Sequence, residues 1–156
     1  MSEQARIEAA ETLEIISFHL AGQVFCVNIM AVREIRGWAM ATPLPQAPTW
    51  VKGVINLRGT VLPIIDLGAR LGFGATEPSQ RHVIIVARIG DKTVGLLVEA
   101  VSDILTVGSV SIQPAPDVSC EAVRCFVKGV IAQEADMISL VSLDGILPEA
   151  ELREAA

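Results

Sequence analysis

The strongest constraint on the fold of this chain is a stretch that occurs twice. Residues 50–71 read WVKGVINLRGTVLPIIDLGARL, and residues 126–147 read FVKGVIAQEADMISLVSLDGIL. The two stretches align without a gap at a displacement of 76 positions, which pairs Trp50 with Phe126 and Gly53 with Gly129. A repeat of this length indicates one structural unit used twice.

The repeat extends upstream at a different spacing. AVREI at 31–35 matches AVSDI at 100–104, a displacement of 69, and each segment follows an apolar run. The second half therefore holds seven more residues between its matched segments, and the turn-rich stretch 113–117 is where we place them. We interpret the chain as two related halves, about 15–72 and about 83–147.

The periodicity of both halves predicts strands. Apolar residues alternate or run continuously in short segments separated by turn formers. Ala21–Gly22, Arg58–Gly59 and Gly90–Asp91 are predicted hairpin turns. Pro63 indicates an edge or a bulge at that point of its strand, and Leu67–Leu71 a short helical turn. This pattern is typical of small β-barrels or a sandwich. Because a unit of about 60 residues is marginal alone, the halves are expected to share an apolar seam.

Composition excludes several classes of protein. Hydrophobic residues make up 51% of the chain, which is incompatible with intrinsic disorder. The net charge of −6 argues against nucleic acid or an anionic membrane surface as the main partner. No apolar run approaches the roughly 20 residues of a membrane span, and the polar N-terminus lacks the apolar core of a signal peptide. We therefore expect a cytoplasmic protein, and three cysteines without a pairing pattern fit a reducing compartment.

The first half contains three distinctive segments, VREIRG at 32–37, VKGVINLRG at 51–59 and LPIIDL at 62–67. Together they resemble the signature of the chemotaxis coupling protein family, CheW. GLLVE at 95–99, VSDIL at 101–105 and the second Lys-Gly pair at 128–129 extend the likeness. It covers nearly the whole chain in family order, and the Asn-Leu-Arg-Gly segment within it is specific.

The resemblance implies an all-β fold of two related five-stranded small β-barrels packed around a shared hydrophobic seam, with short helical turns. We expect a CheW-like domain over residues 13–148. Its first barrel covers about 15–80, and its second covers about 82–147 and is completed by the N-terminal strand. Residues 1–12 are expected to be a flexible lead-in, and 149–156 a short C-terminal tail or helix.

The resemblance also implies a non-enzymatic adaptor. In the family, a groove between the barrels binds the cytoplasmic tip of methyl-accepting chemoreceptors, and a separate surface of the first barrel docks on the regulatory domain of the histidine kinase CheA. The adaptor is cytoplasmic and is recruited to membrane-associated receptor arrays, without inserting into the membrane. The positions that match the receptor-binding groove are Val32, Glu34, Gly53, Asn56, Arg58 and Ile104.

Glu34 and Arg58 form the sharpest candidate pair. Their repeat counterparts are Asp103 and Glu134, so the basic partner is missing from the second half. A charge at a turn is most often only solvated, but this half-specific complementarity and the family match favour an ion pair. Its role stays open between contacting the receptor and supporting the local backbone.

Four apolar residues recur in both halves: Val32, Ile35, Val101 and Ile104. Core packing is the alternative interpretation for all of them, and for Ile35 it is at least as good as a binding role. Gly53 and Gly129 are most simply explained by a backbone conformation or close packing that a Cβ would block.

The sequence offers no constellation for catalysis or metal binding. The two histidines, His19 and His82, have no Cys or Ser-Asp partners in a triad-like arrangement. Cys26 lies in a predicted strand and is interpreted as a small core residue. Cys120 and Cys125 lack further ligands at compact spacing, so no metal and no cofactor are expected. Asp66, Glu99 and Asp103 are scattered acids with no pairing signal in the sequence.

Two other functions compete with the adaptor. One is a small module that titrates or inhibits a CheA-type kinase without engaging receptors, and the other is a β protein that binds a small ligand or a metal. The Glu34–Arg58 pair and the apolar Val32 and Ile104 favour the adaptor over the first of these.

Overall fold

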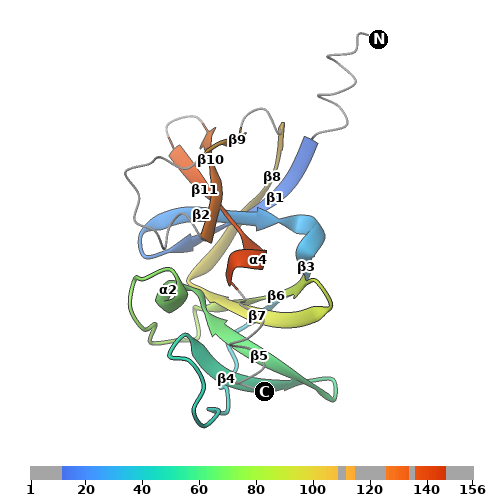
Figure 1. Ribbon diagram of the computed structural model, residues 1–156, viewed down its shortest axis with the longest axis vertical. Helices are drawn as coiled ribbons and strands as arrows, with labels where there is room; N and C mark the ends of the chain where they lie inside the picture. Colours follow the sequence, from blue (N-terminus) through green and yellow to red (C-terminus); the bar gives the residue numbers. More distant parts are fainter. Residues whose placement is uncertain (1–11, 109–111, 115–125, 134–135, 147–156) are drawn as a thin grey trace.

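The computed structural model describes residues 12–108, 112–114, 126–133 and 136–146, and most of these residues lie in strands (Figure 1). The first half holds β1 (Thr12–Leu20), β2 (Gln23–Asn28), η1 (Ile29–Ala31), β3 (Val32–Gly37), β4 (Val51–Leu57), β5 (Thr60–Asp66) and α2 (Leu67–Arg70). The second half holds β6 (Val83–Ile89), β7 (Lys92–Val98), β8 (Ala100–Gly108), β9 (Ile112–Gln113), β10 (Val127–Gln133), β11 (Asp136–Val141) and α4 (Leu143–Ile146).

The strands form two sheets (Figure 1). The five-stranded sheet has the order β3-β6-β7-β5-β4, and the six-stranded sheet has the order β8-β1-β2-β11-β10-β9. Hairpin partners pair antiparallel, whereas β5 pairs with β7 and β11 pairs with β2 in parallel. The predicted all-β fold with two subdomains is confirmed, and the second sheet has six strands rather than five because β9 adds to its edge.

The sequence repeat maps strand by strand onto these two sheets. The strands β1, β2, β3, β4 and β5 have β6, β7, β8, β10 and β11 as their counterparts. Replacing each strand of the five-stranded sheet by its counterpart gives the order β8-β1-β2-β11-β10, which is the order of the six-stranded sheet. Each sheet therefore takes its first hairpin, β6–β7 or β1–β2, from the other half of the chain.

This exchange of hairpins corrects the expected barrel boundaries of about 15–80 and about 82–147. The hairpin at 12–28 belongs to the six-stranded sheet, and the hairpin at 83–98 belongs to the five-stranded sheet. The expectation that the N-terminal strand completes the second barrel agrees with this arrangement but covers only part of it. Sequence similarity identifies which segments are equivalent, but it does not show which copy pairs with which.

The core of the described residues consists of three apolar clusters, one of which joins the two sheets. One cluster, the seam, joins residues of both sheets, among them Phe18, Trp50, Ile85, Leu96 and Phe126. Each sheet also has its own smaller cluster, centred on Ile15 and Ile131 in one and on Ile64 and Ile84 in the other. The predicted shared seam is therefore present.

Strand β6 shows why its sequence, VIIVARI, is continuously apolar. Ile84 and Val86 point into the cluster of the five-stranded sheet, while Ile85 and Ala87 point into the seam. Side chains alternate along a strand, so a strand buried on both faces needs apolar residues at every position. Burial of these four side chains is complete or nearly so.

A cation–π contact joins the two halves within the seam. The guanidinium of Arg70 lies 4.3 Å from the ring centroid of Trp50 and 4.8 Å from that of Phe126. Its Nε donates a 2.9 Å hydrogen bond to the carbonyl of Ile146, the repeat counterpart of Arg70. The aromatic residues that open the two repeated stretches thus flank one cation at the end of α2.

Two expected segments fall mostly outside the described residues. The lead-in, 1–12, is described only at Thr12, which is the first residue of β1. The expected tail or helix at 149–156, together with Leu147, Cys120, Cys125 and Glu134, lies outside the described part of the chain.

Hairpin exchange predicts that neither half folds by itself. A chain of residues 1–80 lacks β6–β7, so β5 would lose its parallel partner β7. A chain of residues 81–156 lacks β1–β2, so β11 would lose its parallel partner β2. Each isolated half would also expose the apolar side chains that it contributes to the seam. Expressed separately, both should show no cooperative thermal transition by circular dichroism. Coexpressed, they should assemble into one folded complex with the full-length chain as reference. A cooperative transition in either isolated half would show this prediction to be wrong.

Candidate binding surface

The Glu34–Arg58 ion pair joins the two ends of the five-stranded sheet, whose outer strands are β3 and β4. Glu34 lies on β3, and Arg58 begins the turn between β4 and β5. The Nη2 atom of Arg58 lies 2.7 Å from Oε1 of Glu34, and Nη1 of Arg36 lies 4.0 Å from the same oxygen. The Arg58 side chain is 72% exposed and that of Glu34 is 28% exposed, so the pair is available to a partner from solvent.

The Arg58–Gly59 turn holds the arginine in place. Leu57 pairs directly with Thr60, so the predicted tight hairpin turn is confirmed. Both turn residues have positive φ, 50° for Arg58 and 84° for Gly59, as a two-residue hairpin of the primed type requires. The Oδ1 atom of Asn56 accepts a 2.8 Å hydrogen bond from the Gly59 amide. Asn56 therefore supports the turn that presents Arg58.

A groove of 430 Å³ lies beside the ion pair. Asn56 and Arg36 line it, together with Met40, Val54 and Val61. Met40 is 88% exposed and Val61 is 68% exposed, so apolar side chains face solvent next to a charged cluster. Larger apolar patches of this kind mark binding sites more often than isolated exposed residues do.

Gly53, on β4 behind this surface, allows two backbone segments to pack closely. A Cβ at Gly53 would collide with the carbonyl of Thr42, and the φ of 143° is also unfavourable for other residues. Thr42 pairs with Val54 in an isolated bridge, so the glycine lets the proline-rich connector lie against β4. Gly129 has the same role, because its Cβ would lie 2.6 Å from the carbonyl of Gln113. Close packing therefore explains both repeated glycines.

The four recurring apolar residues lie on the two edge strands β3 and β8. Val32 and Val101 are half-buried and pack against the seam. Ile35 and Ile104 are 44% and 60% exposed. The core-packing interpretation of Ile35 is therefore wrong: it is exposed like its counterpart Ile104. A register shift lies between each valine and its isoleucine: Val32 pairs with Ala87 and Ile35 with Ile85, while Val101 pairs with Phe18 and Ile104 with Ile16. Each valine and its isoleucine therefore lie on the same face of the sheet, where the valine is half-buried and the isoleucine is exposed.

The structure thus brings together only part of the candidate set. Glu34, Arg58 and Asn56 form one cluster at the β4–β5 turn, with Gly53 in the strand behind them. Val32 lies on the same edge strand as Glu34, and Ile104 lies on the edge strand of the other sheet. Ile35, which was not among the groove candidates, is the exposed apolar residue closest in sequence to Glu34.

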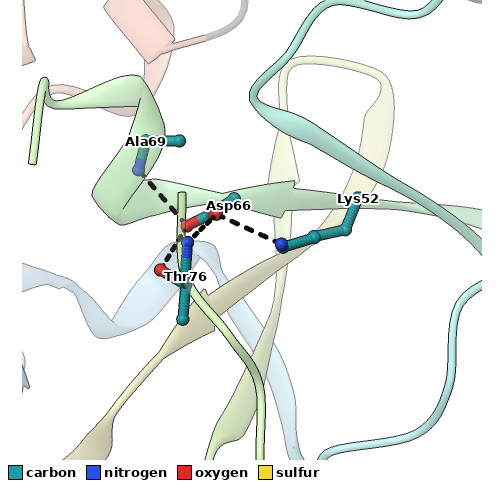
Figure 2. Close-up of polar contacts among 4 residues, drawn as sticks. All are labelled: Lys52, Asp66, Ala69 and Thr76. Atoms are coloured by element: carbon teal, nitrogen blue, oxygen red, sulfur yellow. Dashed lines mark hydrogen bonds and ion pairs between the residues drawn. The ribbon is translucent and has the colours of Figure 1, made fainter. Parts of the chain in front are cut away.

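Asp66 is a buried carboxylate that the sequence analysis missed (Figure 2). Its Oδ1 accepts hydrogen bonds from the Ala69 amide (3.2 Å) and the Thr76 hydroxyl (2.7 Å), and its Oδ2 accepts one from the Thr76 amide (2.7 Å). Lys52 Nζ lies 3.8 Å from Oδ2. Asp66 therefore caps α2, fixes the following loop and anchors the start of β4, next to Gly53.

Glu99 and Asp103 also have partners. Glu99 Oε1 accepts a 2.8 Å hydrogen bond from the Ala21 amide, and the backbone of Asp103 bonds twice to the Ser17 hydroxyl. Sequence separations of 78 and 86 hid these contacts. The sequence carries no pairing signal for these acids, and their partners become apparent only in the fold.

Cys26 is the free cysteine of the described residues, and it lies in the core. Cys26 is fully buried, and desolvation raises the pKa of its thiol from 9.0 to about 12, so at neutral pH it is a core thiol and not a thiolate. Within the described ranges, no three His, Cys, Asp or Glu side chains are grouped closely enough to hold a metal ion. No helix formed by the described residues has the length and apolarity needed to cross a bilayer.

Fold and surface together define a class of protein. Two intertwined sheets carry exposed isoleucines on their edge strands, and an exposed ion pair lies beside a groove with apolar side chains. This is a β-sheet protein-interaction module.

Comparison with known proteins identifies the family. The family model for the CheW-like domain matches residues 14–151. The chain is 61% identical over 143 residues to the chemotaxis protein CheW of Rhizobium meliloti strain 1021, covering 92% of each chain, and 54% identical over 142 residues to a probable chemotaxis protein CheW of Rhizobium etli, covering 91% of this chain and 92% of the other. It also resembles the crystal structure of the scaffolding protein TtCheW from Thermoanaerobacter tengcongensis, with a TM-score of 0.78, 32% identity, and coverage of 86% of this chain and 91% of that one. The chain belongs to the CheW-like family.

Replacement of Asp66 by alanine should destabilise the fold strongly. The change would leave the Thr76 and Ala69 amides and the Lys52 ammonium without their common acceptor. We expect a loss of roughly 2–4 kcal/mol in the free energy of unfolding, measured by urea denaturation. Asp91→Ala, at an exposed turn, is the matched control and should change stability by less than about 0.5 kcal/mol. Equal effects of the two substitutions would contradict a structural role for Asp66.

Proposed function

We propose that this chain is a non-enzymatic adaptor that couples chemoreceptors to a CheA-type histidine kinase. Membership in the CheW-like family supports a role in chemotaxis, and the structural relative TtCheW is described as a scaffolding protein. The observation that carries the proposal is the cluster at the β4–β5 turn, where an exposed ion pair adjoins an apolar groove without catalytic groups.

The receptor would bind along the edge strands. The cytoplasmic tip of a chemoreceptor is a helical hairpin, and an amphipathic helix binds through apolar residues with a polar rim. Ile35 and Ile104 supply exposed apolar contacts, with the half-buried Val32 and Val101 on the same two strands. Glu34 and Arg58 supply a charged pair at one of these edges only.

The kinase would dock on a separate surface of the five-stranded sheet. Its regulatory domain is the expected partner, and separate sites would allow one adaptor to hold both partners at once. The adaptor is proposed to work in the cytoplasm and to join membrane-associated arrays through the receptor, without entering the membrane. No cofactor is required for this function.

The alternative function, titration of the kinase without receptor binding, is less favoured. Such a module would need no receptor site, whereas the bond between Glu34 and Arg58 and the support of their turn by Asn56 favour the adaptor. Binding to a receptor fragment distinguishes the two functions, because only the adaptor should bind it.

Arg58→Ala should separate receptor coupling from stability. The pair is exposed, so its loss should cost only about 0–1 kcal/mol of folding free energy. Receptor-dependent kinase activation should nevertheless weaken, because the variant removes the positive charge of Arg58 and leaves Glu34 without its partner in the exposed ion pair. Arg81→Ala is the matched control, since Arg81 is exposed and lies in the loop before β6. Paired binding assays with kinase and receptor fragment, at one salt concentration, provide the measurement.

Ile104→Asp should abolish receptor binding and spare the kinase contact. Burying a carboxylate under a docked helix is unfavourable by several kcal/mol, whereas the fold should tolerate it because Ile104 is 60% exposed. Met137→Asp is the matched control: Met137 is 59% exposed on β11 of the same sheet, away from the edge strand. If Ile104→Asp and Arg58→Ala both keep full receptor binding, or lose both partners through unfolding, the receptor-site assignment fails.

A further inference from the structure

Strand β8 contains a bulge directly before the exposed Ile104. The ladder between β1 and β8 shifts register at Ser17, so that this one residue lies opposite two residues of β8, Ser102 and Asp103. Two residues against one form a β-bulge, and a bulge changes the direction of the side chains beside it. Ile104 is 60% exposed, so the bulge sets where this apolar side chain stands on the surface.

The hydroxyl of Ser17 bonds to both backbone groups of Asp103. It donates a 3.2 Å hydrogen bond to the Asp103 carbonyl and accepts a 3.0 Å bond from the Asp103 amide. One hydroxyl can make both bonds because it has a single donor and two acceptor positions. Between the two strands, the ladder holds no pair that includes Asp103. The Ser17 side chain, which is 3% exposed, therefore takes the place of a backbone pairing.

Core packing holds β8 on both sides of the bulge but not at the bulge itself. Val101 packs against the seam, and Leu105 and Val107 belong to the cluster of the six-stranded sheet. The three residues between Val101 and Leu105 are all exposed. Because β8 is the outermost strand of its sheet, it has β1 as its ladder partner and no strand on the other side. The bonds from β1 are thus the contacts that fix this segment.

The five-stranded sheet has the same bulge without a hydroxyl. At the displacement of 69, the counterparts of Ser17 and Asp103 are Val86 and Glu34. There Glu34 pairs with Val86 in the ladder, and its carboxylate also accepts a bond from Arg58. The two copies therefore hold equivalent bulges by different contacts, one through the ladder and an exposed ion pair and the other through a buried hydroxyl.

We propose that Ser17 is a positioning residue, whose hydroxyl fixes the bulge of β8 and thereby the place at which Ile104 meets a partner. The identity of that partner, a receptor helix, rests on the proposed function, whereas the contact with Asp103 does not. Without the hydroxyl, the Asp103 amide and carbonyl lose their common partner, which favours movement of this segment toward solvent. Ile104, the next residue of β8, moves with it.

Ser17→Thr and Ser17→Val test this role, because their side chains have nearly the same shape but only threonine keeps the hydroxyl. Amide hydrogen exchange at Asp103, followed by NMR, should be roughly five- to tenfold faster in Ser17→Val than in Ser17→Thr. Ser17→Ala, which adds no atoms to the core, should show the same increase and decides the matter if the larger side chains disturb the fold. Exchange at Glu34, whose bulge has no hydroxyl, is the internal control and should stay unchanged.

Receptor binding connects the bulge with function. The Kd for a receptor fragment should rise several-fold in Ser17→Val and Ser17→Ala, while Ser17→Thr stays close to wild type and kinase binding is unchanged in all three. Rescue by threonine is not expected if Ser17 only fills space. Thr93→Val, at an exposed threonine of β7, is the matched control for loss of a hydroxyl and should change neither exchange at Asp103 nor binding.

Two results would overturn the proposal. One is exchange at Asp103 that is the same in wild type, Ser17→Ala and Ser17→Val, because the hydroxyl would then not hold the bulge. The other is faster exchange with unchanged receptor affinity, because the bulge would then not position Ile104. A wild-type chain that binds no receptor fragment would contradict the proposed function instead, and exchange at Asp103 would still decide whether the hydroxyl fixes β8.

Discussion

Each sheet of this protein depends on a hairpin from the other half of the chain, and most of the structure follows from that exchange. The parallel contacts β5–β7 and β11–β2 are the places where the exchanged hairpins join. Since β1, β2, β6 and β7 are central in their sheets, they are buried on both faces, one toward the sheet's own cluster and one toward the seam. The two subdomains therefore cannot separate without unfolding, and the relative placement of their edge strands is fixed.

The sequence predicted the elements of the fold better than their pairing. The repeat located both copies, and the Arg58–Gly59 turn was placed correctly. Pro63 lies just before the segment of β5 that pairs with β7, because this pairing begins at Ile64. The hairpin exchange was missed, because the repeat shows which segments are equivalent but not whether a hairpin pairs with strands of its own half or of the other half. That choice is seen only in the long-range parallel pairing of β5 with β7 and of β11 with β2.

The candidate site was predictable where its residues are close together in the sequence or differ between the two copies of the repeat. Arg58 and Glu34 stood out because the second half lacks a basic residue at the corresponding position. The role of Asp66 was partly visible, since an aspartate directly before a short helix is a common cap, but its bonds to Thr76 depend on a loop without a sequence pattern. Regular strand alternation would place Val32 and Ile35 on opposite faces, but a bulge between Val32 and Glu34 keeps them on the same face. Val32 is half-buried there and Ile35 is exposed, a difference that the sequence pattern does not show.

A duplicated module offers similar surfaces on its two halves, so the direction in which a partner binds depends on a difference between them. Ile35 and Ile104 are equivalent and both exposed, so in the proposed function a helical partner held by these apolar contacts alone could bind in either of two directions. The Glu34–Arg58 pair exists at one edge only, because the second half has Asp103 without a matching arginine in the repeat. An exposed ion pair contributes little to folding, but a partner in the wrong direction would leave its charged groups unmatched. The same asymmetry that made the pair detectable in the sequence thus gives the surface a direction.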